Sequence, residues 1–183
     1  MSKKVCIVLI GGPCSGKSSA GKLVAKKLDA EYVSSGDIAR EMAERSDIVK
    51  DNLNNGQLAP EQQMRDAVFS KLWQYFESDN RDIVILDGFP RFGEQAEWLR
   101  NVLPVRIEIR YVIIHAPSWV LRSRANARGR SDDGSFERRL DYYRKVTYKD
   151  LYSYAEAVIH TQDISIDECA MLLTDFVKEV MKC

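Results

Sequence analysis

The sequence predicts an α/β protein of three layers, in which a five-stranded parallel sheet lies between two layers of helices. Short apolar runs rich in β-branched residues alternate along the chain with segments whose apolar residues recur at helical spacing. The runs are apolar at consecutive positions, as expected for strands that are buried on both faces. A chain of 183 residues fits one compact domain, so we expect a single domain over residues 1–183.

Five segments are expected to form the strands. They are residues 5–10, 31–34, 82–86, 107–115 and 157–161. The first run stops at Gly11-Gly12 and the third at Asp87-Gly88, and both pairs are turn signals. Because parallel sheets bind ligands at the carboxyl ends of their strands, we expect the functional site at these two ends.

The helices are expected between and after the strands. Residues 18–28 carry apolar residues at helical spacing, and a second helix is expected from about Ile38. Pro60 is expected as the first residue of a third helix, and Pro117 opens a fourth. Residues 165–168 read Ser-Ile-Asp-Glu, a capping box that predicts an amphipathic helix at the C-terminus.

Composition and charge argue against several function classes. The 27 Lys and Arg residues balance 27 Asp and Glu residues, so bulk electrostatics do not favour nucleic acid or anionic membranes as partners. No stretch approaches the roughly 20 apolar residues that span a bilayer. Cys6, Cys14, Cys169 and Cys183 form no CxxC pair and read as reduced thiols. We therefore expect a cytoplasmic monomer that binds neither nucleic acid nor membrane.

Residues 11–18 read Gly-Gly-Pro-Cys-Ser-Gly-Lys-Ser and match the phosphate-loop pattern G-x-x-x-x-G-K-[ST] in full. The pattern follows a buried strand and precedes a helix, which is the context it requires. Its glycines let backbone N–H groups point at phosphates, and the helix N-terminus adds positive potential there. Lys17 can reach the β- and γ-phosphates. The motif predicts a nucleotide site of the P-loop NTPase type, which kinases, GTPases, ATPases and sulfotransferases share.

The apolar run at residues 83–86 ends in Asp87, which supplies a second element of such a site. A carboxylate there can hold Mg²⁺ directly or through its water shell. Ser18 or Ser19 offers a hydroxyl towards the same ion, and which of the two meets the metal stays open. We expect Ser18 and Asp87 to form the metal site, with Mg²⁺ as the cofactor and ATP as the co-substrate.

Arginine is concentrated in one stretch of the chain. Seven of the fifteen arginines lie between Arg122 and Arg144. A phosphoryl-transfer site gathers negative charge from ATP and the acceptor, and a planar guanidinium grips phosphate at two points. The concentration of arginine therefore favours an enzyme whose acceptor itself carries a phosphate.

Five segments occur in the order seen in the adenylate kinase family, which the chain resembles over about residues 4–180. They are residues 11–19, 35–40 (Ser-Gly-Asp-Ile-Ala-Arg), 56–58 (Gly-Gln-Leu), 86–91 (Leu-Asp-Gly-Phe-Pro-Arg) with Gln95, and 130–133 (Arg-Ser-Asp-Asp). The resemblance implies transfer of the γ-phosphoryl of ATP to a nucleoside monophosphate, with AMP the first expectation (ATP + AMP ⇌ 2 ADP). It also implies two mobile insertions, an acceptor-binding flap at about residues 35–64 and a short lid at about 125–137.

The resemblance also implies the role of each residue. On the ATP side the expected contacts are Gly12, Pro13, Cys14, Ser15, Gly16, Lys17, Ser18, Ser19, Arg124, Gln162, Asp163 and Ile164. On the acceptor side they are Ser35, Gly36, Arg40, Gln57, Leu58, Ala59, Gly88, Phe89, Arg91, Gln95, Arg130 and Arg139. The expected catalytic residues are Lys17, Arg91, Arg124, Arg130 and Arg139, and Asp132 and Asp133 match the paired aspartates of the lid.

The chain departs from the family pattern in two respects. The family usually reads Lys-Gly-Thr after the last loop glycine, whereas this chain has Lys17-Ser18-Ser19. The stretch from Arg40 to Gly56 and that from Asp133 to Arg139 are shorter than in common members. We therefore expect a small flap and a compact lid.

Gln95 and Ser35 bear on the choice of acceptor. A glutamine amide can pair with adenine through one donor and one acceptor. Ser35 stands where AMP kinases of the family usually have threonine. Both residues favour AMP, and UMP, CMP and deoxynucleoside monophosphates stay open as alternatives.

Three functions outside this reading stay open. A P-loop kinase for a neutral metabolite, such as gluconate or shikimate, would share the phosphate loop and Asp87 but does not need Arg40 and Arg91 together. A GTPase-type switch would read guanine with an Asn-Lys-x-Asp segment, which the sequence lacks. A degenerate subunit could sense adenylates without turnover, although the full set of arginines argues against this.

Overall fold

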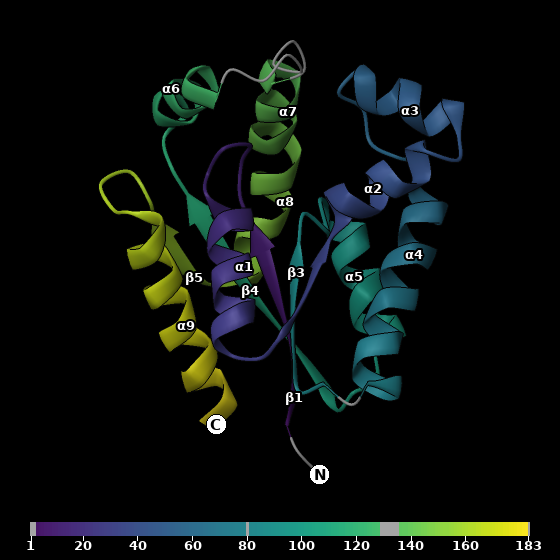
Figure 1. Ribbon diagram of the computed structural model, residues 1–183, viewed down its shortest axis with the longest axis vertical. Helices are drawn as coiled ribbons and strands as arrows, with labels where there is room; N and C mark the ends of the chain where they lie inside the picture. The colour runs from purple at the N-terminus through teal and green to yellow at the C-terminus, as the bar shows by residue number, and fades with distance from the viewer. Residues whose placement is uncertain (1–2, 80, 129–135, 183) are drawn as a thin grey trace.

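The computed structural model describes residues 3–79, 81–128 and 136–182 (Figure 1). Its five strands all pair in parallel, in the order β2-β3-β1-β4-β5. The strands are β1 (Lys4–Ile10), β2 (Glu31–Ser34), β3 (Ile83–Asp87), β4 (Ile107–His115) and β5 (Ala155–His160). The predicted five-stranded parallel sheet is confirmed, and every strand lies within two residues of its expected bounds.

The strands are connected and followed by helices. These are α1 (Lys17–Lys27), α2 (Ser35–Ala43), α3 (Asp47–Asn54), α4 (Glu61–Trp73), α5 (Gly93–Val102), α6 (Ser118–Arg128), α7 (Phe136–Tyr142), α8 (Tyr148–Leu151) and α9 (Ile166–Lys182). Shorter helical turns are η1 (Gln74–Ser78), η3 (Tyr143–Thr147) and η4 (Tyr152–Tyr154).

Side-chain caps account for where several helices begin. The predicted capping box is confirmed, because Ser165 Oγ accepts from the N–H of Glu168 at 3.1 Å and Glu168 Oε2 accepts from the N–H of Ser165 at 2.7 Å. The second helix begins at Ser35, three residues before the expected Ile38, because Ser34 Oγ accepts from the N–H of Asp37. Pro60 caps α4 and is not its first residue. Helix α3 was not expected from the sequence, although Ser46 caps it in the same way.

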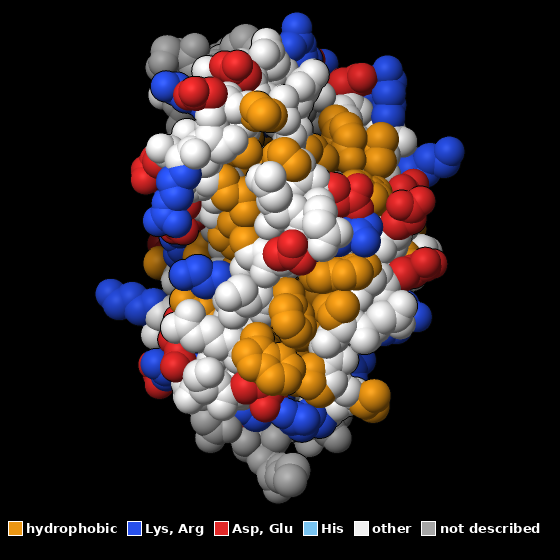
Figure 2. Space-filling view, turned by 90° about the vertical axis from the view of Figure 1, so that its right-hand side faces the viewer, with side chains coloured by type: hydrophobic (Ala, Val, Ile, Leu, Met, Phe, Trp, Pro, Cys, Tyr) orange, Lys and Arg blue, Asp and Glu red, His pale blue; other side chains and the backbone are white. Residues whose placement is uncertain are grey.

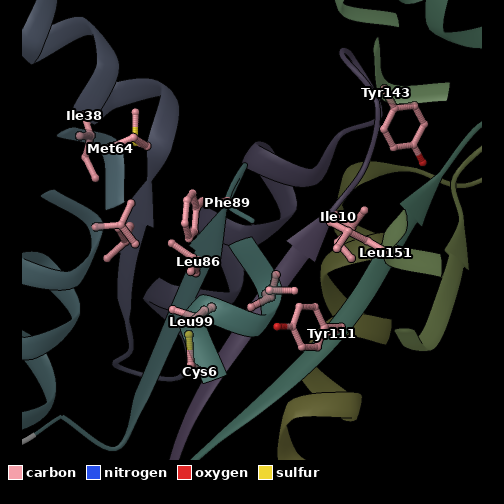
Figure 3. Close-up of a cluster of buried hydrophobic side chains, with 14 of the residues drawn as sticks. Cys6, Ile10, Ile38, Met64, Leu86, Phe89, Leu99, Tyr111, Tyr143 and Leu151 are labelled. Atoms are coloured by element: carbon pink, nitrogen blue, oxygen red, sulfur yellow. The ribbon is translucent and has the colours of Figure 1, made fainter. Parts of the chain in front are cut away.

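Alternate residues of β1 belong to two separate hydrophobic clusters. Cys6, Val8 and Ile10 pack in the cluster that includes α2, α4 and α5 (Figure 3). Val5, Ile7 and Leu9 pack in the cluster formed with α1 and α9. These six side chains are at most 2% exposed, and full burial of a residue such as valine, leucine or isoleucine contributes roughly 1.5–3 kcal/mol. The predicted three layers follow from this double burial.

The sheet order places the ends of β1 and β3 side by side. The chain passes from β1 to β2 and β3 on one side of the sheet, and then crosses to β4 and β5 on the other side. In register, Asp87 at the end of β3 pairs with Leu9 of β1 and with Ser34 of β2. The loops that follow β1 and β3 therefore leave the same edge, at the point where such sheets bind ligands.

The surface over α3, α4 and α5 carries both hydrophobic and polar side chains. Figure 2 shows hydrophobic side chains between charged and other polar groups on this face. Ile48 of α3 is 70% exposed and Trp73 of α4 is 46% exposed. Within the described ranges, no helix combines the length and the hydrophobicity needed to cross a bilayer.

Candidate functional site

The phosphate loop is shaped by its glycines. Gly16 has φ 96°, a left-handed conformation that glycine adopts without steric cost, and it is the N-cap of α1. A Cβ at Gly11 would lie 2.6 Å from the carbonyl oxygen of Ile114, so the loop can approach β4 only without a side chain there. The loop thus turns back onto the positive end of α1, as phosphate binding requires.

A cavity of about 410 Å³, here called the phosphate cavity, lies over this loop. The expected ATP-side residues that line it are Pro13, Cys14, Ser15, Gly16, Lys17, Ser18 and Ser19. Gly12 does not line it, and a Cβ at this position would meet Leu121 and Tyr143. The structure therefore gathers most of the loop around one space.

Asp87 lies at the edge of the phosphate cavity and is almost fully buried, at 3% exposure. Its Oδ2 accepts hydrogen bonds from Ser18 Oγ and from Tyr32 Oη, each at 2.5 Å. Its Oδ1 lies 3.9 Å from Lys17 Nζ and has no hydrogen-bond partner among the described residues. Ser18, and not Ser19, is therefore the serine that contacts Asp87.

A second cavity of about 960 Å³, the acceptor cavity, lies between α2, α3, the start of α4 and the loop after β3. All the described residues expected on the acceptor side line it: Ser35, Gly36, Arg40, Gln57, Leu58, Ala59, Gly88, Phe89, Arg91, Gln95 and Arg139. Residues from four separate parts of the chain thus surround one space.

The two cavities share part of their walls. The residues common to both are Ser35, Gly36, Arg40, Gly88, Arg91 and Arg139. Three guanidinium-bearing residues, from α2, from the loop after β3 and from α7, are therefore placed where the two cavities meet. Such an arrangement can neutralise anionic groups that enter from both sides.

Arg91 is held firmly at this junction. Its Nε donates to the carbonyl oxygen of Gly88 at 2.8 Å, and its backbone N–H donates to Gln95 Oε1 at 2.8 Å. Burial is the main cause that lowers the pKa of Arg91; Tyr142 and Asp87 offset part of this effect, and the nearby positive charge of Arg139 adds to it. Two guanidinium groups in a partly desolvated place repel each other, so an anion bound between them would be favoured.

Arg40 is the most exposed of the three arginines that line both cavities. Its guanidinium donates to Asp37 Oδ1, within the same helix α2. Burial raises the pKa of Asp37, but the hydrogen bond and the charge of Arg40 outweigh it and hold this pKa below its ordinary value. Asp37 therefore stays ionised and holds Arg40 at the cavity wall.

Arg124 lines neither cavity. Its Nη1 donates to Thr161 Oγ1 at 3.1 Å and reaches the carbonyl oxygen of Ser15 at 3.4 Å, and its Nη2 donates to the carbonyl oxygen of Thr161. Residues 162–164 follow in the loop between β5 and α9 and do not line either cavity. Arg124 therefore joins the phosphate loop at Ser15 to the segment after β5 at Thr161.

Some residues of the site lie outside the expected set. Arg128 lines the phosphate cavity, and its Nη1 lies 3.9 Å from Cys14 Sγ. Its position, four residues after Arg124, is one helical turn along α6 and could have revealed it. Arg138 of α7 donates to the carbonyl oxygen of Asn55 at 2.8 Å and so joins α7 to the end of α3. Arg130, Asp132 and Asp133 lie outside the described residues.

Gly88 offers a direct test of this packing. Its φ is 80°, and a Cβ there would lie 2.6 Å from Ser35 Oγ, on the wall that both cavities share. We expect Gly88→Ala to lower the free energy of unfolding by about 2 kcal/mol, from backbone strain and from the contact with Ser35. Urea denaturation followed by circular dichroism measures this change.

Gly93, the first residue of α5, supplies the matched control for Gly88. Its φ is outside the left-handed region, and an added Cβ would meet no heavy atom within 4 Å. Gly93→Ala should therefore change the free energy of unfolding by less than about 1 kcal/mol. Equal effects of the two substitutions would contradict a special role for Gly88.

Comparisons with known proteins agree with this geometry. The AAA domain family matches residues 10–138. Adenylate kinase 1 of Nostoc sp. is 33% identical over 149 residues, which cover 77% of this chain and 79% of that protein. The adenylate kinase of Encephalitozoon cuniculi is 29% identical over 170 residues, 90% of this chain and 89% of the relative. UMP-CMP kinase 1 of Oryza sativa subsp. japonica is 29% identical over 153 residues, 79% of this chain and 61% of the relative.

A solved structure supports the fold independently. The crystal structure of a gluconokinase from Sinorhizobium meliloti 1021 superposes with a TM-score of 0.70, over 100% of this chain and 96% of that one. Its sequence identity is 15%, so this likeness bears on the fold alone. With the phosphate loop, the shared arginine wall and the relatives above, the chain belongs to the adenylate kinase family and is an ATP-dependent kinase of the nucleoside-monophosphate kinase type.

Proposed function

We propose that the enzyme transfers the γ-phosphoryl of ATP to AMP, in the reaction ATP + AMP ⇌ 2 ADP. The observation that carries this proposal is the wall of Arg40, Arg91 and Arg139 between the two cavities. A neutral acceptor would need no such cluster of guanidinium groups, whereas an acceptor that carries its own phosphate would.

The environment of Gln95 favours adenine as the acceptor base. This side chain is only 4% exposed and lines the acceptor cavity. Its Oε1 accepts from the N–H of Arg91, which fixes the amide and leaves its NH₂ group to donate. The carbonyl oxygen keeps a second lone pair, so one amide can both donate to and accept from an adenine edge.

The residues around Asp87 fit Mg²⁺. A buried carboxylate oxygen without a hydrogen bond, next to the hydroxyl of Ser18, offers the oxygen ligands that this ion prefers. Among the described residues no group of three or more His, Cys, Asp or Glu could hold a metal, which suits an ion that nucleotide phosphates also bind. When bound, Mg²⁺ would neutralise charge on the transferring phosphoryl group.

The mechanism requires positioning and no general base. The acceptor phosphate is already an anion at neutral pH, so it can attack in line once both nucleotides are held. Lys17 and the loop amides would hold the phosphates of ATP, and the arginine wall would hold those of the acceptor. In this proposal the segment at about 35–64 is a flap and that at about 125–137 a lid, and both close to exclude water. The cytoplasmic location and the monomeric state stay predictions.

A panel of acceptors tests the proposal. ATP and Mg²⁺ are incubated with AMP, dAMP, CMP, UMP or gluconate, and the nucleotides are separated by chromatography. We expect the highest kcat/KM with AMP. A higher kcat/KM with CMP or UMP would replace AMP within the same family. Turnover of gluconate without turnover of any nucleoside monophosphate would overturn the proposal.

Gln95→Leu tests the base contact separately from the phosphate contacts. Removal of the amide should reduce kcat/KM for AMP by about 10–100-fold, since a bidentate base contact is worth about 1–3 kcal/mol of discrimination. The kcat/KM for CMP should fall less, so the preference for AMP over CMP should narrow. Gln63→Leu, at an exposed position of α4, is the matched control. An unchanged preference in Gln95→Leu would remove Gln95 from base selection.

A further inference from the structure

Tyr32 of β2 is a polar neighbour of Asp87 that comes from outside the phosphate loop and the arginine wall. Its hydroxyl donates to Asp87 Oδ2 at 2.5 Å, and the residue lines the phosphate cavity. The two residues belong to different strands, Tyr32 to β2 and Asp87 to β3. Register explains the contact, because β2 pairs with β3 up to Ser34 and Asp87 at the carboxyl edge of the sheet.

The ring of Tyr32 is fixed by close packing against α1. A Cβ at Gly21 would lie 3.0 Å from Tyr32 Cε2 and 2.8 Å from Leu9 Cδ1, so the helix passes over the ring at a residue without a side chain. Lys22 Nζ lies 5.5 Å from the ring centroid on the same helix. The hydroxyl therefore reaches Asp87 from a rigid support.

The two carboxylate oxygens of Asp87 differ in the number of hydrogen bonds that they accept. Oδ2 accepts from both Tyr32 and Ser18, which restricts rotation of the carboxylate. Oδ1 is buried without a hydrogen bond and lies 3.9 Å from Lys17 Nζ.

We propose that Tyr32 is a positioning residue for the metal site: its hydroxyl holds Asp87 so that Oδ1 stays directed to the Mg²⁺ of bound ATP. The inference rests on the proposed function, because it requires Mg²⁺ at Asp87. It concerns a hydrogen bond that helps to prepare the carboxylate before the metal arrives. Loss of such an outer partner typically weakens metal binding by about 10–100-fold.

The test measures metal affinity directly. Mn²⁺ serves as a paramagnetic probe, and its dissociation constant is determined by electron paramagnetic resonance with the full chain and saturating ATP. Tyr32→Phe removes the hydroxyl and keeps the ring. We expect the dissociation constant for Mn²⁺ to rise about tenfold, while binding of ATP in the presence of a chelator stays the same. Fluorescence titration with a labelled nucleotide measures the latter.

Matched variants make the result specific. Tyr152→Phe makes the same chemical change at an exposed residue that lines neither cavity, and should leave the Mn²⁺ constant unchanged. Asp87→Asn shows how far the dissociation constant for Mn²⁺ rises when the carboxylate itself is lost. Thermal unfolding of Tyr32→Phe checks that the variant is folded at the temperature of the titration.

The outcomes separate this inference from the proposed function. If the folded Tyr32→Phe variant binds Mn²⁺ as tightly as the unaltered chain, Tyr32 has only a packing role and the inference is overturned. If the dissociation constant for Mn²⁺ is also unchanged in Asp87→Asn, Asp87 is not part of the metal site, and the inference fails as well. Transfer to AMP is read independently from the acceptor panel.

Discussion

Lys17→Ala is expected to lower kcat by about 10²–10³-fold, because preorganised donors at a developing charge have effects of this size. Lys17 lines the phosphate cavity, and its Nζ lies 3.9 Å from Asp87 Oδ1. Its ammonium is therefore placed both to meet the transferring phosphates and to balance a buried carboxylate. Steady-state rates with ATP, AMP and Mg²⁺ measure the loss, with ADP quantified by chromatography.

The effect should belong to this lysine and not to charge on α1 in general. Lys26→Ala removes an exposed lysine from the last turn of the same helix and should leave kcat within about twofold, as surface changes usually do. Binding of ATP to Lys17→Ala should weaken as well, which a titration with labelled nucleotide detects. A Lys17→Ala enzyme with nearly full kcat would show that the cavity over the phosphate loop is not the site of transfer.

Arg91→Lys should reduce kcat/KM for AMP by about 10²-fold, although the positive charge is kept. Arg91 is oriented by Gly88 and lies on the wall common to both cavities. A planar fork can donate two parallel hydrogen bonds to a phosphate, and a lysine ammonium cannot reproduce that geometry. Loss of one partner of a buried, charged hydrogen-bonded pair costs about 2–5 kcal/mol, which is consistent with this reduction.

The signature of Arg91→Lys is its asymmetry between the two substrates. Most of the loss should come with variation of AMP, and KM for ATP should change less. Arg91 lies on the shared wall, but its backbone N–H binds Gln95, which lines only the acceptor cavity. Arg100→Lys on α5 is the control, since Arg100 is exposed and its guanidinium lies over the ring of Tyr154. An unchanged KM and kcat for AMP in Arg91→Lys would exclude this arginine from acceptor binding.

The sequence alone predicted the sheet and the loop, because both depend on local patterns. Residues 5–10 are continuously apolar, and burial on both faces of the sheet is the arrangement that satisfies them. The phosphate loop has glycine at position 16, where φ is 96°, and the capping box needs Ser165 and Glu168 three residues apart. The family resemblance was equally visible, and the comparisons confirm it.

Other features of the site could not be predicted from local patterns. The sequence left Ser18 and Ser19 equivalent, and only the fold brings Ser18 to Asp87. The sequence predicted an ATP contact for Arg124, which stays a prediction, but it did not show that the guanidinium contacts Thr161, because the end of β5 lies beside the phosphate loop only in the fold. Spacing within α6 could have indicated Arg128, whereas no local signal marked Tyr32.

The sequence by itself therefore determined which segments become strands, where phosphate is bound and which side chains carry the charge. The tertiary structure decided which of those side chains face one another. Three segments meet at Asp87 because β1 and β2 both pair with β3 in a fixed register. One carboxylate then contacts residues 55 to 70 positions away along the chain, namely Tyr32, Ser18 and Lys17. Register and packing between elements are properties of the assembled sheet, so periodicity along a single segment does not specify them.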